Sequence, residues 1–350
     1  MQMRKWSLRI LILAVSMLYT SGCMSFCPPL VSGPHPPVTL SAWTAWWKMA
    51  DGVGELKRKK RKLSSVASFG VCFDSEDKLI MPDEMDMISP RALEKFWEKP
   101  VYLTIVNDVR QKNGNYLYKD TAVLHRVLAN RERCLCHVAE IVKMAKKHNY
   151  DGIDLDYECV FKDESLVKPY LDFTYLLAKA AIDNDLKLRI VLEPSADFGA
   201  GFVKGPEYVV MLYNLYGTHG DPGPKADAAF IEKTIKKMQA LPGKKSVAFA
   251  TGGCVWERSG FLNLGSGPYK KYIDEKQAVE LRDKYKAEVK RDAGSAALCF
   301  NYEEKGKKYT VWYADSETLN AWITLAANNG IESVALWRLG GNTSIDEVKR

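Results

Sequence analysis

The sequence lacks the patterns that would point to a metal-binding or disulfide-stabilised protein. It holds eight cysteines and five histidines, but no two cysteines have the CxxC spacing of zinc and redox sites. Cys134 and Cys136 lie two positions apart on an expected helix, so their side chains diverge. Cys72, Cys159 and Cys299 lie in strand-like apolar runs, and we expect them to be buried thiols. We predict no metal site and no cofactor.

Heptads, low-complexity tracts and short repeats are also missing, and so is an apolar run long enough to cross a bilayer comfortably. The N-terminal run Ile10–Leu18 is too short for that. It follows three basic residues and precedes small ones, which is the order of a secretory signal peptide. We therefore predict an exported protein with a signal peptide over residues 1–22.

The end of this segment resembles the processing site of a bacterial lipoprotein. In Ser21-Gly22-Cys23 the cysteine would carry the lipid, although Thr20 stands where leucine is usual. Residues 23–37 are rich in proline and predict an extended tether. We expect a lipoprotein that is anchored to a membrane of the bacterial cell envelope. Ordinary cleavage with secretion, or an uncleaved anchor, is the alternative.

Charge of one sign is not in large excess, because the formal net charge is +7. Six consecutive basic residues, Lys57–Lys62, supply much of it. Such a run can bind nucleic acid or an anionic surface, but export argues against nucleic acid. We therefore expect the run to form a solvated face of the first helix of a barrel domain. We also expect a monomer that binds no nucleic acid.

What the sequence does contain is an alternation of strand and helix signals, which is typical of a parallel sheet. Residues 38–350 suit one large domain, and a hydrophobic content of 47% supports a large core. One connection, Asp163–Asp183, has a clear helical pattern. The eight predicted strands are Val38–Trp43, Ser65–Phe73, Val101–Asn107, Tyr150–Glu158, Leu188–Glu193, Tyr208–Tyr213, Ser246–Ala250 and Ser333–Trp337. They predict an α/β fold of the (β/α)8 TIM-barrel type.

The seventh and eighth strands are separated by too many residues for a simple crossover. This segment contains a helical pattern near Glu275–Lys290 and two strand-like runs, Ala296–Tyr302 and Tyr309–Trp312. The residues between these runs, Glu303–Lys307, predict a hairpin loop. We predict a small α+β insertion, over about residues 254–313, that covers the carboxyl-terminal face of the barrel.

The stretch Asp151–Glu158 holds four carboxylates in eight residues. On a strand, Asp154, Asp156 and Glu158 share one face and the apolar spacers share the other. Neighbouring carboxylates cannot all ionise, so at least one pKa is raised, as a general acid at neutral pH requires. The alternatives are a solvated acidic edge strand and a divalent-cation site, although a straight strand offers poor geometry for a cation. Glu193 is another carboxylate candidate, which could instead form a salt bridge.

The same stretch resembles the DGxDxDxE motif of glycoside hydrolase family 18, the chitinase-type enzymes. All four acidic positions are filled, and Gly152 occupies the glycine position. In that family the motif ends the fourth strand of a (β/α)8 barrel, and an insertion before the eighth strand often walls one side of the cleft. The resemblance covers about Val38 to the end of the chain and is greatest to bacterial cell-wall and spore-type members.

Two further strand ends resemble motifs of the family. Met211-Leu212-Tyr213-Asn214 resembles the MxYD motif, with Asn214 where aspartate is usual. The eighth strand ends like the segment that carries a sugar-stacking tryptophan, here Trp337, for which core packing is the alternative. Trp43 and Asn107 also fall at predicted strand ends, where barrel enzymes place their chemistry. We expect Met211, Asn214, Trp337, Trp43 and Asn107 to bind substrate, with core and turn roles as the alternatives for the last two.

The resemblance implies a retaining hydrolase of β-linked N-acetylhexosamine glycans without a protein nucleophile. It implies that Glu158 is the general acid and then the base, while Asp156 and Tyr213 hold the acetamido group of the substrate. The other implied roles are a proton shared between Asp154 and Asp156, a floor under the sugar from Trp337, and structural roles for Asp151 and Gly152.

The substrate and the function class stay open at this point. Chitin, peptidoglycan and protein-linked glycans all contain N-acetylglucosamine, and no chitin- or peptidoglycan-binding module is recognisable. One alternative to an enzyme is a chitinase-like lectin, against which the retained Glu158 argues and for which Asn214 argues. Another is a surface lipoprotein whose barrel only scaffolds partners.

Overall fold

The computed structural model describes residues 29–259 and 265–350, so the predicted signal peptide and Cys23 lie outside it. Within these two ranges, no helix is both long enough and apolar enough to span a membrane. The described strands form a ten-stranded sheet, which closes into a barrel, and a separate five-stranded sheet.

Eight parallel strands form the barrel, which confirms the predicted fold. β1 pairs with β2 on one side and with β15 on the other, and β2 also pairs with β4, which closes the ring. Two short antiparallel strands, β3 (Leu79–Ile80) and β5 (Tyr116–Leu117), extend β2 and β4. The barrel strands are β1 (Thr39–Ala45), β2 (Leu63–Asp74), β4 (Val101–Arg110), β6 (Gly152–Asp156), β7 (Lys187–Leu192), β8 (Glu207–Met211), β9 (Lys245–Ala250) and β15 (Ser333–Leu339).

The acidic strand β6 lies in the middle of the sheet, between β4 and β7, and all of its residues are buried. A solvated acidic edge strand is therefore excluded. The predicted alternation of its side chains is confirmed, because Ile153 and Leu155 pack in the large apolar cluster that also contains helix residues. Asp154 and Asp156 point into the barrel instead. Glu158 follows the strand by two residues and is not part of it.

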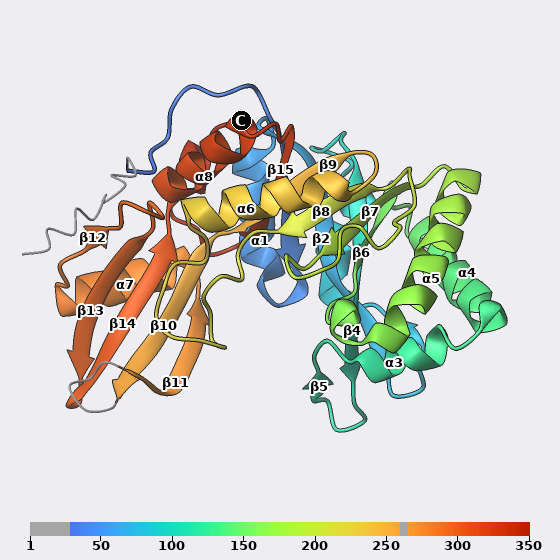
Figure 1. The fold of residues 1–350 in the computed structure, drawn as a ribbon, viewed down its shortest axis with the longest axis horizontal. Helices are drawn as coiled ribbons and strands as arrows, with labels where there is room; N and C mark the ends of the chain where they lie inside the picture. Colours follow the sequence, from blue (N-terminus) through green and yellow to red (C-terminus); the bar gives the residue numbers. More distant parts are fainter. Residues whose placement is uncertain (1–28, 260–264) are drawn as a thin grey trace, which may run out of the picture.

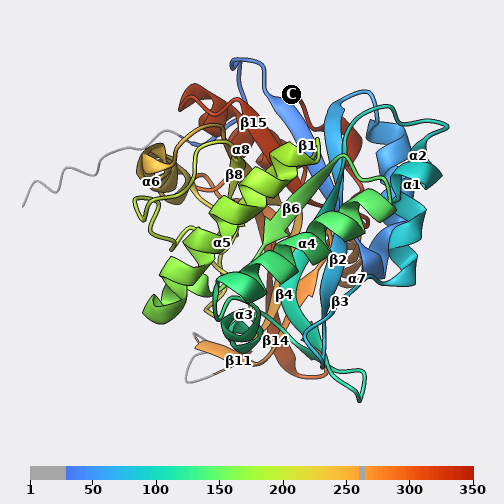
Figure 2. The same ribbon diagram turned by 90° about the vertical axis from the view of Figure 1, so that its right-hand side faces the viewer.

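The ring of helices around the barrel is incomplete. Residues 193–206, between β7 and β8, contain no helix, and the connection from β2 to β4 holds only η2 (Asp83–Ile88) and α2 (Pro90–Leu93). Helices α4 and α5 lie side by side on the outer face near β4 and β6 (Figure 2). The predicted helix at Asp163–Asp183 is confirmed, with the Asp163 side chain as its N-cap. The helices that cover the barrel are α1 (Met49–Lys59), α3 (Thr121–Val127), α4 (Arg131–Lys147), α5 (Glu164–Asp183), α6 (Ala228–Lys237) and α8 (Ser316–Asn328).

The basic run Lys57–Lys62 ends the first helix, as predicted, but its face is not wholly solvated. Lys59 is buried and its ammonium donates to the carbonyl of Val348 at 2.6 Å. Lys62 donates to the carbonyl of Asp346 at 2.9 Å. Burial and the neighbouring Lys62 lower the pKa of Lys59 to about 8. Part of the run therefore holds the C-terminal tail against α1, which the charge pattern alone did not indicate.

The insertion before β15 is a five-stranded antiparallel sheet with one helix packed against it, and it stands at one end of the molecule, away from α4 and α5 (Figure 1). The predicted helix and two strands are confirmed. The predicted hairpin loop is shorter, because only Lys305 and Gly306 form the turn, both with positive φ. Its elements are β10 (Gly252–Ser259), β11 (Gly265–Ile273), α7 (Glu275–Tyr285), β12 (Lys290–Arg291), β13 (Leu298–Glu304) and β14 (Lys307–Ala314).

Strands β10 and β11 were missed from the sequence, because glycines interrupt the alternation of apolar residues there. Gly253 has a packing reason: a Cβ at this position would lie 1.8 Å from the carbonyl oxygen of Trp312 on the neighbouring strand β14. Strand β10, which lies between β11 and β14, therefore needs a residue without a side chain near the point where it leaves the barrel.

The predicted burial of the cysteines is right only in part. Cys72 is buried, but Cys159 and Cys299 are half-buried. Cys159 does not lie in a strand; it follows β6 with a φ of 64°. All six cysteines in the described ranges have free thiols.

Candidate active site

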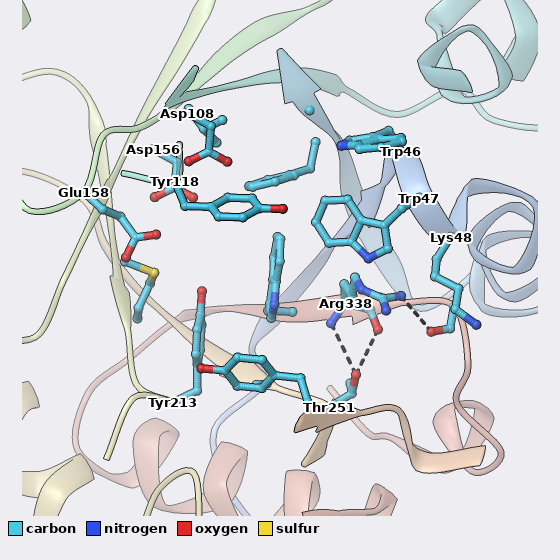
Figure 3. Close-up of a pocket in the computed structure, with 18 of the residues that line it drawn as sticks. Trp46, Trp47, Lys48, Asp108, Tyr118, Asp156, Glu158, Tyr213, Thr251 and Arg338 are labelled. Carbon is cyan, nitrogen blue, oxygen red and sulfur yellow. Dashed lines mark hydrogen bonds between the residues drawn. The ribbon is translucent and has the colours of Figure 1, made fainter. Parts of the chain in front are cut away.

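A cavity of about 740 Å³ opens at the carboxyl-terminal ends of the barrel strands. One wall comes from β4, β6 and β8, and the opposite wall comes from the insertion and the end of β15. Figure 3 shows Asp108, Asp156 and Glu158 on one side of the cavity, with Trp46, Trp47 and Lys48 on the other. Of the residues predicted from the sequence, the cavity is lined by Asn107, Asp156, Glu158, Met211, Tyr213, Asn214 and Trp337.

Asp154 lies beneath the cavity and is fully buried. Its carboxylate accepts hydrogen bonds from Arg189 Nε at 2.7 Å, Trp43 Nε1 at 2.6 Å and Thr104 Oγ1 at 2.9 Å. Thr104, Asp154 and Arg189 are register partners on three adjacent strands, so the barrel geometry itself brings them together. These three donors all come from other residues, and the sharing of a proton between Asp154 and Asp156 stays a prediction.

Asp156 ends strand β6 and lines the cavity on the same side as Asp108 and Glu158. Only 7% of its surface is exposed. Burial, together with the carboxylates of Glu158 and Asp154, raises the pKa of Asp156 well above that of an ordinary aspartate. Its Oδ1 atom is buried and has no hydrogen-bond partner among the described residues. A buried carboxyl with a free oxygen can accept a proton or an N–H group that enters the cavity.

Glu158 is held by its backbone rather than by its strand. The Asn107 side chain accepts from the Glu158 N–H at 2.9 Å and donates to the Glu158 carbonyl at 3.1 Å. Burial raises the pKa of Glu158, although Lys119 offsets part of that rise. The Lys119 ammonium lies 2.5 Å from Glu158 Oε2. A carboxyl with these properties can release and recover a proton at the cavity surface.

Tyr213 follows β8 and points into the cavity beside Asp156 and Glu158 (Figure 3). Burial and the neighbouring carboxylates raise the pKa of the Tyr213 hydroxyl well above its ordinary value, so the hydroxyl keeps its proton as a hydrogen-bond donor. Met211 is buried below it and Asn214 lies next to it in the wall.

Trp337 forms the centre of an aromatic wall. Its ring makes edge contacts with Phe69 at 4.6 Å, Trp43 at 5.9 Å and Trp47 at 6.4 Å between ring centroids. Thr251, at the end of β9, fixes the end of β15 by donating to the Arg338 carbonyl at 3.0 Å, as drawn in Figure 3. An exposed face of aromatic rings suits the apolar C–H face of a sugar.

The structure separates the remaining sequence candidates. Trp43 lies under the cavity in the barrel core, where it bonds to Asp154, so its core role is the right one. Asn107 lines the cavity but acts on the Glu158 backbone. Asp151 accepts from the Val101 N–H at 2.8 Å, which is a structural contact. Glu193 forms the salt bridge that was the alternative, with Lys162 at 3.6 Å.

Gly152 has a packing reason. A Cβ at this position would lie 2.7 Å from the ring of Tyr102 and 2.7 Å from the carbonyl oxygen of Lys187. The start of β6 can therefore pass between its neighbours only without a side chain. Among the described residues, no three His, Cys, Asp or Glu side chains are placed to hold a metal ion.

Sequence reasoning missed several residues of the cavity wall that come from loops. Trp46 and Trp47 follow β1, and Tyr116, Tyr118 and Lys119 lie on the excursion after β4. Tyr116 stacks on Trp46 at 6.1 Å and on Tyr118 at 6.0 Å between ring centroids. The clustering of aromatic residues at Trp43, Trp46 and Trp47, next to a predicted strand end, is the signal that could have indicated the first of these loops.

No family model matches the chain. Among curated proteins, the uncharacterized glycosylase YvbX of Bacillus subtilis (strain 168) is 25% identical over 241 residues, which make up 64% of this chain and 67% of that protein. The cortical fragment-lytic enzyme of Bacillus anthracis is 24% identical over 245 residues, 65% of this chain and 55% of that enzyme. The second match therefore spans little more than half of the relative.

Two solved structures share the fold. The spore cortex-lytic enzyme SleL of Bacillus megaterium QM B1551 superimposes with a TM-score of 0.73 at 18% identity, over 90% of this chain and 73% of that one. A chitinase from Chromobacterium violaceum ATCC 12472 gives a TM-score of 0.73 at 22% identity, over 89% of this chain and 96% of that one. At these identities the likeness shows the fold alone.

Proposed function

We propose that this chain is a chitinase-type glycoside hydrolase of family 18, which cleaves β-linked glycans that contain N-acetylglucosamine and retains the configuration at the anomeric carbon. The observation that carries the proposal is the pairing of Asp156 and Glu158 in one wall of the cavity, both with a raised pKa. Glu158 is the proposed general acid, because it is the more exposed of the two and lies at the cavity surface.

We propose that the catalysis is substrate-assisted. Asp154 and Asp156 lie on β6, which ends two residues before Glu158, so they come from the same side of the cavity as Glu158 and do not lie across from it. In the described part of the chain, two other carboxylates line the cavity, and each is engaged: Asp108 accepts from the Lys119 N–H at 2.8 Å, and Asp274 caps α7 and pairs with Lys48 at 3.4 Å. A protein nucleophile must approach the face of the sugar opposite the acid, whereas the acetamido oxygen of the substrate is already there.

The chemistry then divides among three side chains. Glu158 gives its proton to the glycosidic oxygen and later takes one from the attacking water. Asp156 accepts the acetamido N–H with its unpartnered Oδ1, and Tyr213 donates to the acetamido carbonyl oxygen and orients it toward the anomeric carbon. Because these contacts tighten as the ring closes, Asp156→Asn should lower turnover far more than affinity.

A glycan without acetyl groups tests this mechanism. A fully deacetylated chitosan oligomer should bind the cavity but be hydrolysed on the order of 100-fold or more slowly, because it has lost the intramolecular nucleophile. A thiazoline analogue of the cyclised intermediate should inhibit. Both are measured against a fully acetylated oligomer of the same length. Efficient cleavage of the deacetylated oligomer, or a trapped covalent adduct between sugar and protein, would rule the mechanism out.

The substrate class is proposed from the relatives and needs its own experiment. The printed names of the relatives include chitinase and cortical fragment-lytic enzyme, so chitin-type and peptidoglycan-type glycans are both candidates. Product analysis on chitooligosaccharides and purified peptidoglycan, side by side, distinguishes them. Binding to either glycan without any product would favour the lectin alternative, for which Asn214 in the cavity wall is the specific observation.

We also propose export and lipid anchoring at Cys23, on the basis of the sequence before residue 37. Cys23→Ser should prevent lipidation, so the variant should lose membrane association or remain unprocessed. The measurement is fractionation of the expressing cells with detection of the processed and unprocessed forms. A variant that is processed normally and stays in the membrane fraction would contradict the proposal.

A further inference from the structure

We propose that Lys119 is the receptor for a carboxylate on the sugar that leaves, next to the scissile oxygen, so that the enzyme prefers acidic glycans to neutral chitin. The inference rests on the proposed function, because it assigns a substrate class to the same cavity. It comes from one contact that the general-acid mechanism does not use, the ion pair between Lys119 and Glu158.

The pair is built into the fold. Asn107 and Asp108 are consecutive residues of β4. Asn107 holds Glu158, and Asp108 holds Lys119. The Asn107 side chain binds both the N–H and the carbonyl of Glu158, at 2.9 and 3.1 Å. Asp108 accepts from the Lys119 N–H at 2.8 Å, and the Asn107 carbonyl accepts from the Asp120 N–H at 2.9 Å. Strand β4 therefore holds the backbone of both Glu158 and Lys119, and this places the Lys119 ammonium next to the Glu158 carboxylate.

Lys119 is nevertheless accessible from the cavity. Its side chain is 44% exposed, whereas that of Glu158 is 15% exposed. Among the described residues, Glu158 is the carboxylate that forms an ion pair with it. The other charged groups that act on this pair are Asp108, Asp156 and Glu193, and Glu193 already pairs with Lys162.

The reaction itself breaks the pair. A general acid must carry its proton when the substrate is bound, and a protonated Glu158 no longer offers Lys119 a negative charge. The catalytic form of the cavity therefore contains an ammonium without its counterion. A substrate carboxylate that takes the place of Glu158 restores the ion pair and leaves Glu158 free to hold its proton. A neutral glycan cannot do this.

Position decides which carboxylate fits. Glu158 must approach the glycosidic oxygen, so Lys119, in contact with Glu158, lies close to the ring carbons that adjoin the carbon bearing this oxygen. Two kinds of β-linked glycan carry a carboxylate there. One is a peptidoglycan strand freed of its peptides, with a lactyl ether on the neighbouring carbon; the other contains a uronic acid. In peptidoglycan the lactyl carboxylate is free only after an amide-cleaving hydrolase has removed the peptide.

The experiment compares kcat/KM on three glycans of similar length: chitooligosaccharides, peptide-free peptidoglycan strands and hyaluronan oligosaccharides. The unmodified enzyme should prefer at least one acidic glycan, and the one preferred identifies the source of the carboxylate. Lys119→Met should lower kcat/KM about 10- to 100-fold more for that glycan than for the neutral glycan, the range of a hydrogen bond between charged groups. Lys119→Arg should retain the preference.

A matched control is Lys112→Met, on the same excursion but with an exposed side chain that does not line the cavity. It should behave like the unmodified enzyme. The pH profile gives a second measurement, since Lys119 lowers the pKa of Glu158. The alkaline limb of kcat/KM on the neutral glycan should therefore move to higher pH in Lys119→Met, because the acid keeps its proton longer.

Equal losses on acidic and neutral glycans would mean that Lys119 only supports the fold, and an unmodified enzyme with no acidic preference would overturn the proposal. Should no glycan be hydrolysed at all, the proposed function fails, and binding still tests Lys119. Glu158→Gln should then bind the acidic glycan more tightly than the unmodified protein, and Glu158→Gln with Lys119→Met should lose that gain. Unchanged binding in both variants would refute the receptor.

Discussion

Glu158→Gln should lower kcat by roughly 100- to 10,000-fold on acetylated glycans, while the protein stays folded and still binds them. The amide has nearly the shape of the carboxyl but has no proton to transfer. The backbone contacts of Asn107 hold residue 158 by its main chain, so they survive the change. The measurement combines product analysis with the affinity of the variant for an uncleaved oligomer.

Glu132→Gln is the matched control, because Glu132 is exposed on α4 and does not line the cavity. It should retain full activity. If Glu158→Gln still hydrolyses an unactivated glycan at an undiminished rate, the acid lies elsewhere. Glu193 would then be the next carboxylate to replace, since it accepts from the Cys159 N–H at 2.6 Å, one residue beyond Glu158.

Arg189→Met should destabilise the protein by about 3 to 5 kcal/mol in the free energy of unfolding, the range for breaking a buried ion pair. Arg189 is buried inside the barrel, bonds to Asp154 at 2.7 Å and stacks 4.9 Å from the rings of both Trp43 and Tyr102. Without the guanidinium, the fully buried Asp154 carboxylate has no countercharge. Urea denaturation of the two proteins gives the difference directly.

Arg133→Met is the control for the loss of an arginine, because Arg133 is exposed on α4, and it should change the free energy of unfolding by less than about 0.5 kcal/mol. Replacing both partners of the pair, in Arg189→Met with Asp154→Leu, should recover part of the loss. A change of less than about 1 kcal/mol for Arg189→Met would show that the pair is not essential to the barrel.

The sequence predicted the parts of this molecule that depend on local periodicity. The alternation along Asp151–Glu158 correctly placed Ile153 and Leu155 on one face of the strand and Asp154 and Asp156 on the other. The eight strands were found for the same reason. Because parallel strands end at one face, their terminal residues could be brought together without knowing the angles between them.

What the sequence did not predict depends on contacts between distant loops. Lys119 reaches Glu158 only because Asn107 and Asp108 anchor both segments, and nothing near Lys119 in the chain indicates an active site. Arg189 looked like any polar residue at a strand start, but the strand register places it beside Asp154. The sequence therefore did not indicate that a cation from the next strand donates to the Asp154 carboxylate.

The closure of the barrel has a consequence for how the protein is made. Thr39, near the beginning of the described chain, pairs with Ser333 on the last strand. While the ribosome is still producing the insertion, β1 has its neighbour β2 but lacks β15, so the nascent chain cannot complete its core. A barrel that stays open until β15 (Ser333–Leu339) has been made is compatible with the export that we propose. Deletion of β15 should therefore leave a chain that cannot complete its barrel and is degraded.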